Sequence, residues 1–278
     1  MINKELKLYK TLVDNKLKDV FRGLKKEVDK REMPVVLFNA MHYSVFNGGK
    51  RIRPILCIAT YNSMKNNCKL KIVNCKFDDV LPFACGIELV HTFSLIQDDL
   101  PSMDNDDFRR GKPSLHRKYG EAIALLAADA LFATAFQLFS QAKISEKIKT
   151  RAIAELARVC GPTGLVGGQI LDIMKSQQSI VRGQQVIDQK KTAELIAGSM
   201  KIGAIVAGAR ENKIKKINRA GISLGMLFQV TDDILDKTKG EKQEASRYAK
   251  QTKLTAKLLG NEFNWLSSFT DYIQERKQ

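Results

Sequence analysis

The sequence has little of what a disulfide-bonded or zinc-binding protein needs. Its 278 residues include five cysteines and three histidines, with no Cys-x-x-Cys pair and no histidine pair at the spacing of zinc ligands. An odd number of cysteines also argues against a disulfide framework. We therefore expect free thiols in a reducing compartment. The thiols are those of Cys57, Cys68, Cys75, Cys85 and Cys160.

Long apolar runs are also missing. No uninterrupted apolar stretch of about 18 residues occurs, which is the length that a membrane-spanning helix needs. The first residues run directly into charged side chains, without the apolar block of a secretory signal. These absences predict a cytoplasmic protein with no integral membrane association.

Proline is scarce and confined to the first part of the chain. The last of six prolines is Pro162, so nothing later forbids a helix. Segments 83–96 and 122–141 are apolar on most sides, which predicts central helices of a bundle. Segments 192–209 and 220–235 are rich in small residues that suit close helix packing. Without strand rhythm, repeats or linkers, the sequence predicts one all-α domain.

Basic residues outnumber acidic residues by 46 to 30, which gives a formal net charge of +16. This excess predicts an anionic partner, and the sign alone allows nucleic acid, a membrane surface or a phosphorylated small molecule. Nucleic acid has no support from a zinc finger or an RNA-recognition pattern. The turn Lys50-Arg51-Ile52-Arg53 and the pair Arg109-Arg110 can each bind phosphate or form solvated surface. Pro54 predicts a helix start directly after the first turn.

Acidic residues gather in two clusters despite the basic excess. Five aspartates fall between Asp98 and Asp107, after an apolar segment, where they repel one another unless a cation lies between them. A second cluster contains Asp232, Asp233 and Asp236 at the end of another apolar segment. Mg²⁺ prefers hard oxygen ligands and combines one or two carboxylates with substrate phosphate oxygens. Two such clusters, facing each other across a bundle, predict a Mg²⁺ site for a diphosphate.

Five ordered motifs carry a resemblance to a known family. They are Gly48-Gly49-Lys50-Arg51-Ile52-Arg53-Pro54, then Asp98-Asp99 with Asp104 and Arg109-Arg110-Gly111, then Gly167-Gly168-Gln169 with Asp172, then Lys191-Thr192, and finally Phe228-Gln229 with Asp232-Asp233 and Asp236. From about Phe38 to Leu259 the chain resembles the trans-isoprenyl diphosphate synthases, most closely the bacterial farnesyl diphosphate synthases. The resemblance implies a single synthase domain over residues 1–278, folded as an all-α barrel of helices around a deep central cavity. It also implies a homodimer and Mg²⁺ at both aspartate motifs.

The resemblance also implies a role for each motif residue. The side chains expected to act in catalysis are Asp98, Asp99, Asp104, Lys191 and Asp232. The expected Mg²⁺ ligands are Asp98, Asp104 and Asp232, assisted by Asp99 and Asp236. The residues expected to bind isopentenyl diphosphate are Lys50, Arg53, His91 and Arg110, although a lone histidine on an apolar helix can also be a core residue. The residues expected to bind the allylic diphosphate are Arg109, Lys191, Thr192 and Gln229.

The implied reaction joins isopentenyl diphosphate to an allylic diphosphate. As the allylic C–O bond breaks, the leaving diphosphate gains charge, so nearby cations stabilise the transition state more than the ground state. The allylic cation then needs a dry, apolar cavity, since water would quench it to an alcohol. Attack by the alkene of isopentenyl diphosphate and loss of a proton complete the condensation.

Product length is expected to depend on residues below the first aspartate motif. Phe93 lies five residues before Asp98, about 7.5 Å down the helix at 1.5 Å per residue, where a bulky side chain makes a floor. Together with Ser94 and the Pro101-Ser102 insertion, this pattern resembles farnesyl-forming bacterial members and predicts a C15 product. Geranyl and geranylgeranyl diphosphate stay open as products, because other walls also shape the cavity and Phe93 can be a plain core residue.

Segment 237–258 departs from the family pattern. It lacks the usual Gly-Lys of the mobile loop and the Gly-Lys-x-Thr-Tyr run, whose lysine and tyrosine positions hold Thr252 and Thr255. We expect this basic stretch to include a flexible loop, either a solvated surface or a phosphate-contacting flap that uses Lys239 or Lys242. The departure keeps open a weakly active or non-catalytic regulatory relative.

Overall fold

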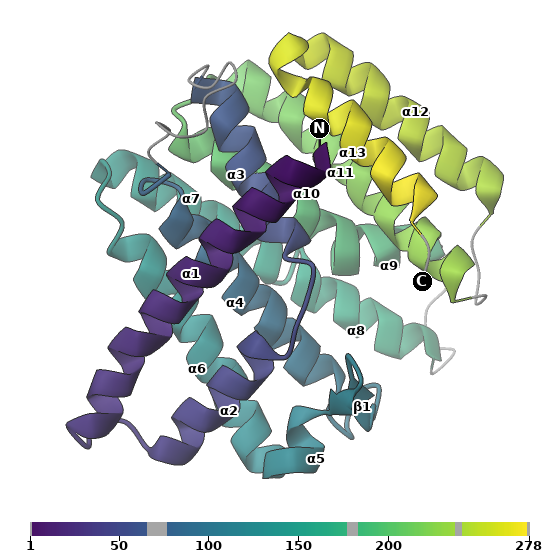
Figure 1. Ribbon diagram of the computed structural model, residues 1–278. Coiled ribbons are helices and arrows are strands. Elements are labelled where there is room, and N and C mark those ends of the chain that lie inside the picture. The colour runs from purple at the N-terminus through teal and green to yellow at the C-terminus, as the bar shows by residue number, and fades with distance from the viewer. Residues whose placement is uncertain (1, 66–76, 177–182, 237–240, 277–278) are drawn as a thin grey trace.

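The computed structural model describes residues 2–65, 77–176, 183–236 and 241–276, and these confirm the all-α fold (Figure 1). The helices up to the middle of the chain are α1 (Ile2–Asp29), α2 (Val35–Phe46), α3 (Ile52–Lys65), α4 (Leu81–Asp98), α5 (Leu115–Tyr119) and α6 (Glu121–Ser140). Those that follow are α7 (Glu146–Cys160), α8 (Leu165–Ser176), α9 (Gln184–Asp188), the π-helical turn η2 (Gln189–Ala193), α10 (Glu194–Val206), α11 (Glu211–Leu235), α12 (Lys242–Leu259), the 3-10 turn η3 (Asn261–Phe263) and α13 (Asn264–Glu275).

Helices α4 and α6 form the middle of the bundle, as their apolar composition predicts. They pack along each other, and α4 is also flanked by α1 and α3. Gly86 allows the close contact, because a Cβ atom there would lie 2.7 Å from the ring of Phe139 on α6. Helix α1 crosses the outside of this layer, as Figure 1 shows. The end of α4 at Asp98 is therefore held by a helix that is buried over most of its length.

Helix α6 is long and apolar enough to cross a membrane by length and composition, and among the described residues it is the one helix that is. The same composition is typical of a central helix in a bundle. The side chains that α6 buries in the protein are Ala124, Ala127, Ala128, Leu131, Thr134, Ala135 and Phe139.

Helices α10 and α11 meet through small residues. A Cβ atom on Gly221 would lie 2.6 Å from the Cα of Ala197, and one on Gly225 would lie 2.5 Å from the Cα of Ala193. Both pairs repeat at a spacing of four residues, so the contact follows one face of each helix. This packing fixes α11, and thus the second aspartate cluster, against η2 and α10.

Segment 237–258 is helical from residue 242 onward, so any loop that the stretch includes falls before α12. Residues 237–240, with Lys239, lie outside the described residues. The remainder forms α12, which packs on α11 in the outer layer with α13 (Figure 1). Its buried positions follow a helical repeat, at Ala245, Ala249, Thr252, Ala256 and Leu259. The dense basic charge obscured this apolar stripe, because the lysines occupy the other faces of the helix.

Other local predictions agree with the structure more closely. The break around Pro162 separates α7 from α8, while α3 begins at Ile52, two residues before Pro54. Pro54 thus lies in the first helical turn, where its missing N–H group is tolerated. Cys57, Cys85 and Cys160 are free and buried, whereas Cys68 and Cys75 lie outside the described residues.

Candidate active site

The first acidic wall is the C-terminal end of α4 and the loop after it. The helix ends at Asp98, and the backbone N–H of Asp104 donates to the carbonyl of Asp98 over 2.9 Å, which turns the loop back toward the helix. Burial raises the pKa of the Asp98 carboxyl to about 6; Lys191 opposes this shift, and Asp104 and Asp99 add to it by repulsion. The side chains of Asp98 and Asp104 make no hydrogen bond or ion pair with another described residue. Asp98 and Asp104 are therefore acidic side chains of this wall without a bonded cation in the described chain.

Asp99 differs from its neighbour because Arg109 pairs with it. The Arg109 guanidinium also bonds the carboxylate of Asp106 at 2.8 Å. Arg109 is brought there by the short hairpin of β1 (Phe108–Arg109) and β2 (Lys112–Pro113), and the side chain of Asn47 donates to its carbonyl over 3.1 Å. The arginine expected to bind allylic diphosphate thus lies against the first wall.

The glycine-rich turn before α3 contacts the same hairpin. Arg110 donates to the carbonyl of Gly48 over 2.6 Å. Gly49 has a φ of +119°, and a Cβ atom there would lie 2.7 Å from Arg110 Nη1. The second glycine is required at this position by its backbone conformation and by the closeness of the guanidinium.

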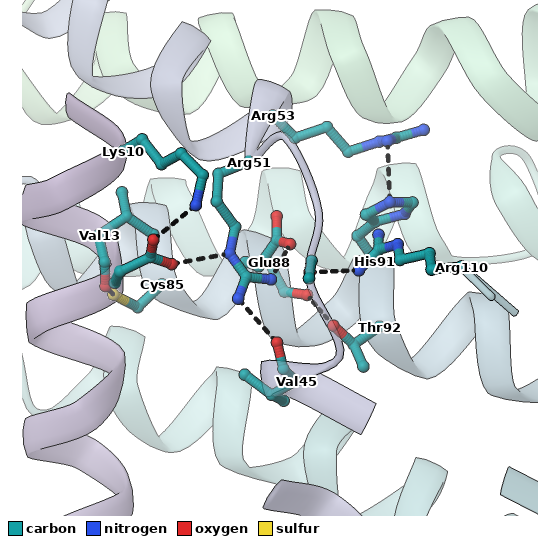
Figure 2. Close-up of polar contacts among 12 residues, drawn as sticks. Lys10, Val13, Val45, Arg51, Arg53, Cys85, Glu88, His91, Thr92 and Arg110 are labelled. Carbon is teal, nitrogen blue, oxygen red and sulfur yellow. Dashed lines mark hydrogen bonds and ion pairs between the residues drawn. The ribbon is translucent and has the colours of Figure 1, made fainter. Parts of the chain in front are cut away.

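Arg53 and His91 form a partly buried polar pair between α3 and α4. Arg53 Nη1 lies 3.2 Å from His91 Nε2 (Figure 2). Burial and the adjacent charge of Arg53 hold the pKa of His91 well below its usual range, so the imidazole is neutral and Nε2 accepts from the arginine. Burial also lowers the pKa of Arg53 to about 10. His91 is therefore a partner of a predicted phosphate-binding arginine, and Arg53 Nε is buried without an acceptor in the described chain.

Arg51, which is not among the expected diphosphate ligands of the basic turn, has a structural role. It is buried, and its guanidinium bonds Glu88 at 2.7 Å, Asp14 at 3.0 Å and the carbonyl of Val45 at 2.7 Å (Figure 2). These acceptors come from α1, α2 and α4. Arg51 therefore joins three helices beneath the turn.

A third side of the site comes from the π-helical turn η2. A Cβ atom on Gly168 of α8 would lie 2.6 Å from the backbone nitrogen of Lys191, so this glycine allows η2 to pack directly on α8. Lys191 Nζ lies 2.9 Å from Asp172 of α8. Although burial opposes it, the negative charges of Asp98, Asp172 and Asp104 raise the pKa of Lys191. Lys191 therefore faces the first acidic wall and is held by Asp172.

The second acidic wall is the last turn of α11, and its side chains are already connected. Thr192 donates to Gln229 over 2.8 Å, and Gln229 donates to Asp233 over 2.9 Å. Asp232 is paired with Arg276, which follows α13. Burial raises the pKa of Asp232, while the nearby cations of Arg276 and Lys50 oppose the rise. Asp236 caps α11.

The electrostatic contacts connect these walls around one site. Asp98 and Asp104 act on Lys191, and Asp232 acts on Arg53. Among the described residues, however, no group of three histidine, cysteine, aspartate or glutamate side chains converges on a metal position. The charged oxygen donors and the repulsion at Asp98 fit Mg²⁺, provided that a ligand supplies further oxygens.

An aromatic cluster continues below the first wall. Phe93 of α4 is 7% exposed, and its ring lies 4.8 Å from that of Phe132 on α6, which in turn lies 5.1 Å from Phe136. Ser94 is buried beside it and donates to the carbonyl of His91. At the level of the predicted floor, Phe93 is thus part of a cluster of three aromatic rings.

Two positions where the sequence departs from the family pattern, Thr252 and Lys253, belong to the outer helix α12. Thr252 is fully buried in α12, and Lys253 pairs with Asp271 of α13. Lys242 is the first residue of α12. Thr252 and Lys253 are therefore engaged within the layer formed by α12 and α13.

Comparison with known proteins agrees with the motifs. The polyprenyl synthetase family matches residues 34–255. The chain belongs to this family. As a polyprenyl synthetase it is similar to geranylgeranyl pyrophosphate synthase 4 of Arabidopsis thaliana, with 36% identity over 97% of the chain and 71% of the relative. It is also similar to farnesyl diphosphate synthase of Geobacillus stearothermophilus, with 39% identity over 77% of the chain and 70% of the relative.

A solved structure of this family supports the fold assignment. The chain matches the apo structure of an FPP/GFPP synthase from Zymomonas mobilis with a TM-score of 0.83 and 29% identity, covering 99% of this chain and all of the other. The chain spans 60 to 71% of the length of the curated plant relatives that it matches. The isoprenoid synthase fold of this polyprenyl synthetase is therefore established.

Sequence reasoning missed two residues of the site. Asp172 was recognised within a motif but given no role, and the structure shows it holding Lys191. Arg276 was not recognised at all, because a single arginine near the end of the described chain has no motif or periodicity to mark it. Only the fold brings it to Asp232.

Proposed function

We propose that this polyprenyl synthetase is a Mg²⁺-dependent short-chain trans-prenyltransferase, one domain over residues 1–278, that condenses isopentenyl diphosphate with dimethylallyl and geranyl diphosphate. The observation that carries this proposal is the arrangement of two acidic walls around Lys191. Asp98 and Asp104 act on Lys191 from one wall, and Thr192 joins it to the other wall through Gln229. Such an arrangement supports binding of a diphosphate between the walls.

Mg²⁺ fits the oxygen donors of this site. Asp98, Asp104 and Asp232 would hold it, with Asp99 and Asp236 in support. When bound, Mg²⁺ supplies positive charge to the diphosphate that leaves the allylic carbon.

The chain's own side chains would do the remaining work. Lys191 and Arg109 bind the allylic diphosphate and stabilise the charge that it gains on leaving. The hydroxyl of Thr192 and the amide of Gln229 orient that diphosphate from the second wall. Aromatic and aliphatic side chains of α4 and α6 exclude water from the allylic cation.

Isopentenyl diphosphate is assigned to the basic side of the site. Arg53, Lys50 and Arg110 are its proposed ligands, and His91 fixes the direction of Arg53. The buried Arg53 Nε has no acceptor in the described chain, and a phosphate oxygen would satisfy it. Arg51 is excluded from this set, because all of its contacts are structural.

We propose farnesyl diphosphate as the main product. The aromatic cluster of Phe93, Phe132 and Phe136 supports a floor that stops the chain at C15. Geranylgeranyl diphosphate is the second candidate, because geranylgeranyl synthases are prominent among the similar proteins. We also propose a homodimer, the usual assembly implied by the resemblance.

Product analysis tests the activity directly. Purified protein is incubated with Mg²⁺, isopentenyl diphosphate and each of dimethylallyl, geranyl and farnesyl diphosphate, and the dephosphorylated alcohols are separated by chromatography. Farnesol as the end product, lost on chelation of the metal, is expected. Geranylgeraniol from all three starters would replace the C15 assignment, and the absence of any product would reject the enzyme.

Phe93→Ala tests the proposed floor. Removal of the ring opens space beneath the allylic site, so products longer than C15 are expected from geranyl diphosphate. Phe83→Ala is the control, because Phe83 is a fully buried ring of the same helix that packs instead on Phe139. An unchanged product spectrum in folded Phe93→Ala protein would remove Phe93 from this role.

A further inference from the structure

The C-terminal end of the described chain contacts the second acidic wall. Arg276 directly follows α13, and its guanidinium pairs with the carboxylate of Asp232, 44 residues away in the sequence. Helix α13 itself packs against α11 (Figure 1). No motif of the sequence analysis includes this arginine, and no step described above uses it.

The burial of the two partners is unequal, and this decides on which side of the carboxylate the arginine lies. The side chain of Arg276 is 8% exposed, whereas that of Asp232 is 39% exposed. The arginine therefore supports the carboxylate from the protein side, and the open side of Asp232 stays accessible. A guanidinium that blocked the site would show the opposite distribution.

The guanidinium is fixed by contacts other than the ion pair. Its central carbon lies 4.3 Å from the centroid of the Phe228 ring, one helical turn before Asp232. Its Nη2 also lies 3.4 Å from the Phe228 carbonyl. A planar guanidinium held by a ring face and a helix carbonyl has little freedom to turn. Arg276 therefore presents its donor to Asp232 in one direction.

The ion pair engages a single oxygen of Asp232. Arg276 Nη2 donates to Oδ1, which leaves Oδ2 for another cation. A carboxylate that accepts from a fixed donor on one oxygen is oriented for a metal on the other, because groups behind a metal ligand set its direction.

We propose that Arg276 is a positioning residue that orients Asp232 for binding of a Mg²⁺–diphosphate complex, so that the C-terminal segment is part of the active site. This inference rests on the proposed function, because it needs Asp232 to hold the metal. It assigns to Arg276 an effect on affinity for the metal complex that is separate from any effect on folding.

The test measures binding rather than turnover. Inorganic pyrophosphate is titrated into the full-length protein by calorimetry, with and without Mg²⁺. Arg276→Met keeps the length of the side chain and removes the donors, and it is expected to weaken Mg²⁺-dependent binding by about tenfold or more. Arg276→Lys is expected to recover part of the loss, since it restores the charge without the planar fork.

Arg247→Met is the matched control. Arg247 also lies over an aromatic ring, at 4.8 Å from Tyr248, and pairs with a carboxylate, that of Glu244 at 3.0 Å, but its side chain is 60% exposed on α12. Its removal should leave pyrophosphate binding unchanged. Asp232→Asn should weaken binding, and adding Arg276→Met to it should cause little further loss, because both act through one carboxylate.

The outcomes separate this inference from the proposed function. Unchanged or tighter binding in folded Arg276→Met protein, with wild-type binding intact, would overturn the positioning role alone. If the wild-type protein shows no Mg²⁺-dependent binding, the proposed function fails first. Circular dichroism and thermal unfolding of each variant without ligand identify losses that come from misfolding, and Arg276→Lys then decides the question with the charge retained.

Discussion

The two acidic walls of the site contain the same residue type at similar spacing, yet they are held in different ways. Asp98 and Asp104 on the first wall make no hydrogen bond or ion pair with other described side chains, and burial raises the pKa of Asp98 to about 6. On the second wall, Asp232 is paired with Arg276 and Asp233 accepts from Gln229. Folding therefore gives Asp232 and Asp233 of the second wall a bonded partner, whereas Asp98 and Asp104 of the first wall are left without one.

This difference separates two tasks that one motif type can perform. A carboxylate without a partner favours cation binding, because the cation relieves repulsion that the fold leaves in place. A carboxylate held by a fixed donor instead has its free oxygen oriented toward the ligand position. We therefore expect substitutions in the first wall to affect the chemistry most, and those in the second to act through geometry.

The largest effect is expected from Asp98→Asn. This change keeps the shape of the side chain and removes the charge that a metal needs, so the rate of product formation should fall by at least about 1000-fold. The measurement is incorporation of labelled isopentenyl diphosphate with geranyl diphosphate as starter. Asp107→Asn is the control, because Asp107 pairs with Arg117 and is exposed. A loss of less than tenfold would show that the first wall does not carry the metal charge.

The support behind the first wall is tested by Arg51→Met. Arg51 and Glu88 form a salt bridge in which the side chains are 3% and 1% exposed, so removal of one partner leaves the other charged and buried. The free energy of unfolding should fall by about 3 to 5 kcal/mol, measured by urea unfolding followed by circular dichroism. Arg22→Met breaks an exposed pair with Asp19 and should change stability by less than about 1 kcal/mol. Equal effects of the two changes would contradict the structural role of Arg51.

The smallest effect is expected from Thr192→Val, which tests the connected second wall. The change removes the hydroxyl that donates to Gln229. One lost neutral hydrogen bond should lower kcat/KM for geranyl diphosphate by about three- to tenfold. Thr255→Val removes a threonine that bonds only within α12 and should leave the rate unchanged. If Thr192→Val matched Asp98→Asn in effect, the two walls would not differ as proposed.

Much of the fold follows from local sequence signals. The apolar segments 83–96 and 122–141 became α4 and α6, and the break at Pro162 separates two helices. These signals are strong because each can be read from a short stretch of sequence: an apolar composition on all sides marks a buried helix, and proline, which lacks an N–H group, ends one. The helix of residues 242–259 was not singled out in advance, since the density of lysines concealed a stripe of small buried residues such as Ala249 and Ala256.

The site was less predictable where its contacts are long-range. Motif spacing indicated that Asp98 and Asp232 belong to one site. The resemblance named Arg53 and not Arg51 as a diphosphate ligand, but charge alone gives no reason to separate two arginines that are two residues apart in one basic turn. Arg51 has a φ of 54°, and this turn of the backbone directs it into the protein toward Glu88. Arg276 is harder still, because its partner is reached only when α11, α12 and α13 are packed.

The close contact of α10 with α11 limits how this protein can evolve a different product. Any side chain larger than hydrogen would overlap the backbone of α10 at Gly221 and that of η2 at Gly225, so this interface allows almost no substitution. Substitution is easier on α4 and α6, where Phe93 and Phe132 can be replaced separately by smaller side chains. Directed evolution toward longer isoprenoids should accordingly enrich changes on α4 and α6 and leave the glycines of α11 untouched.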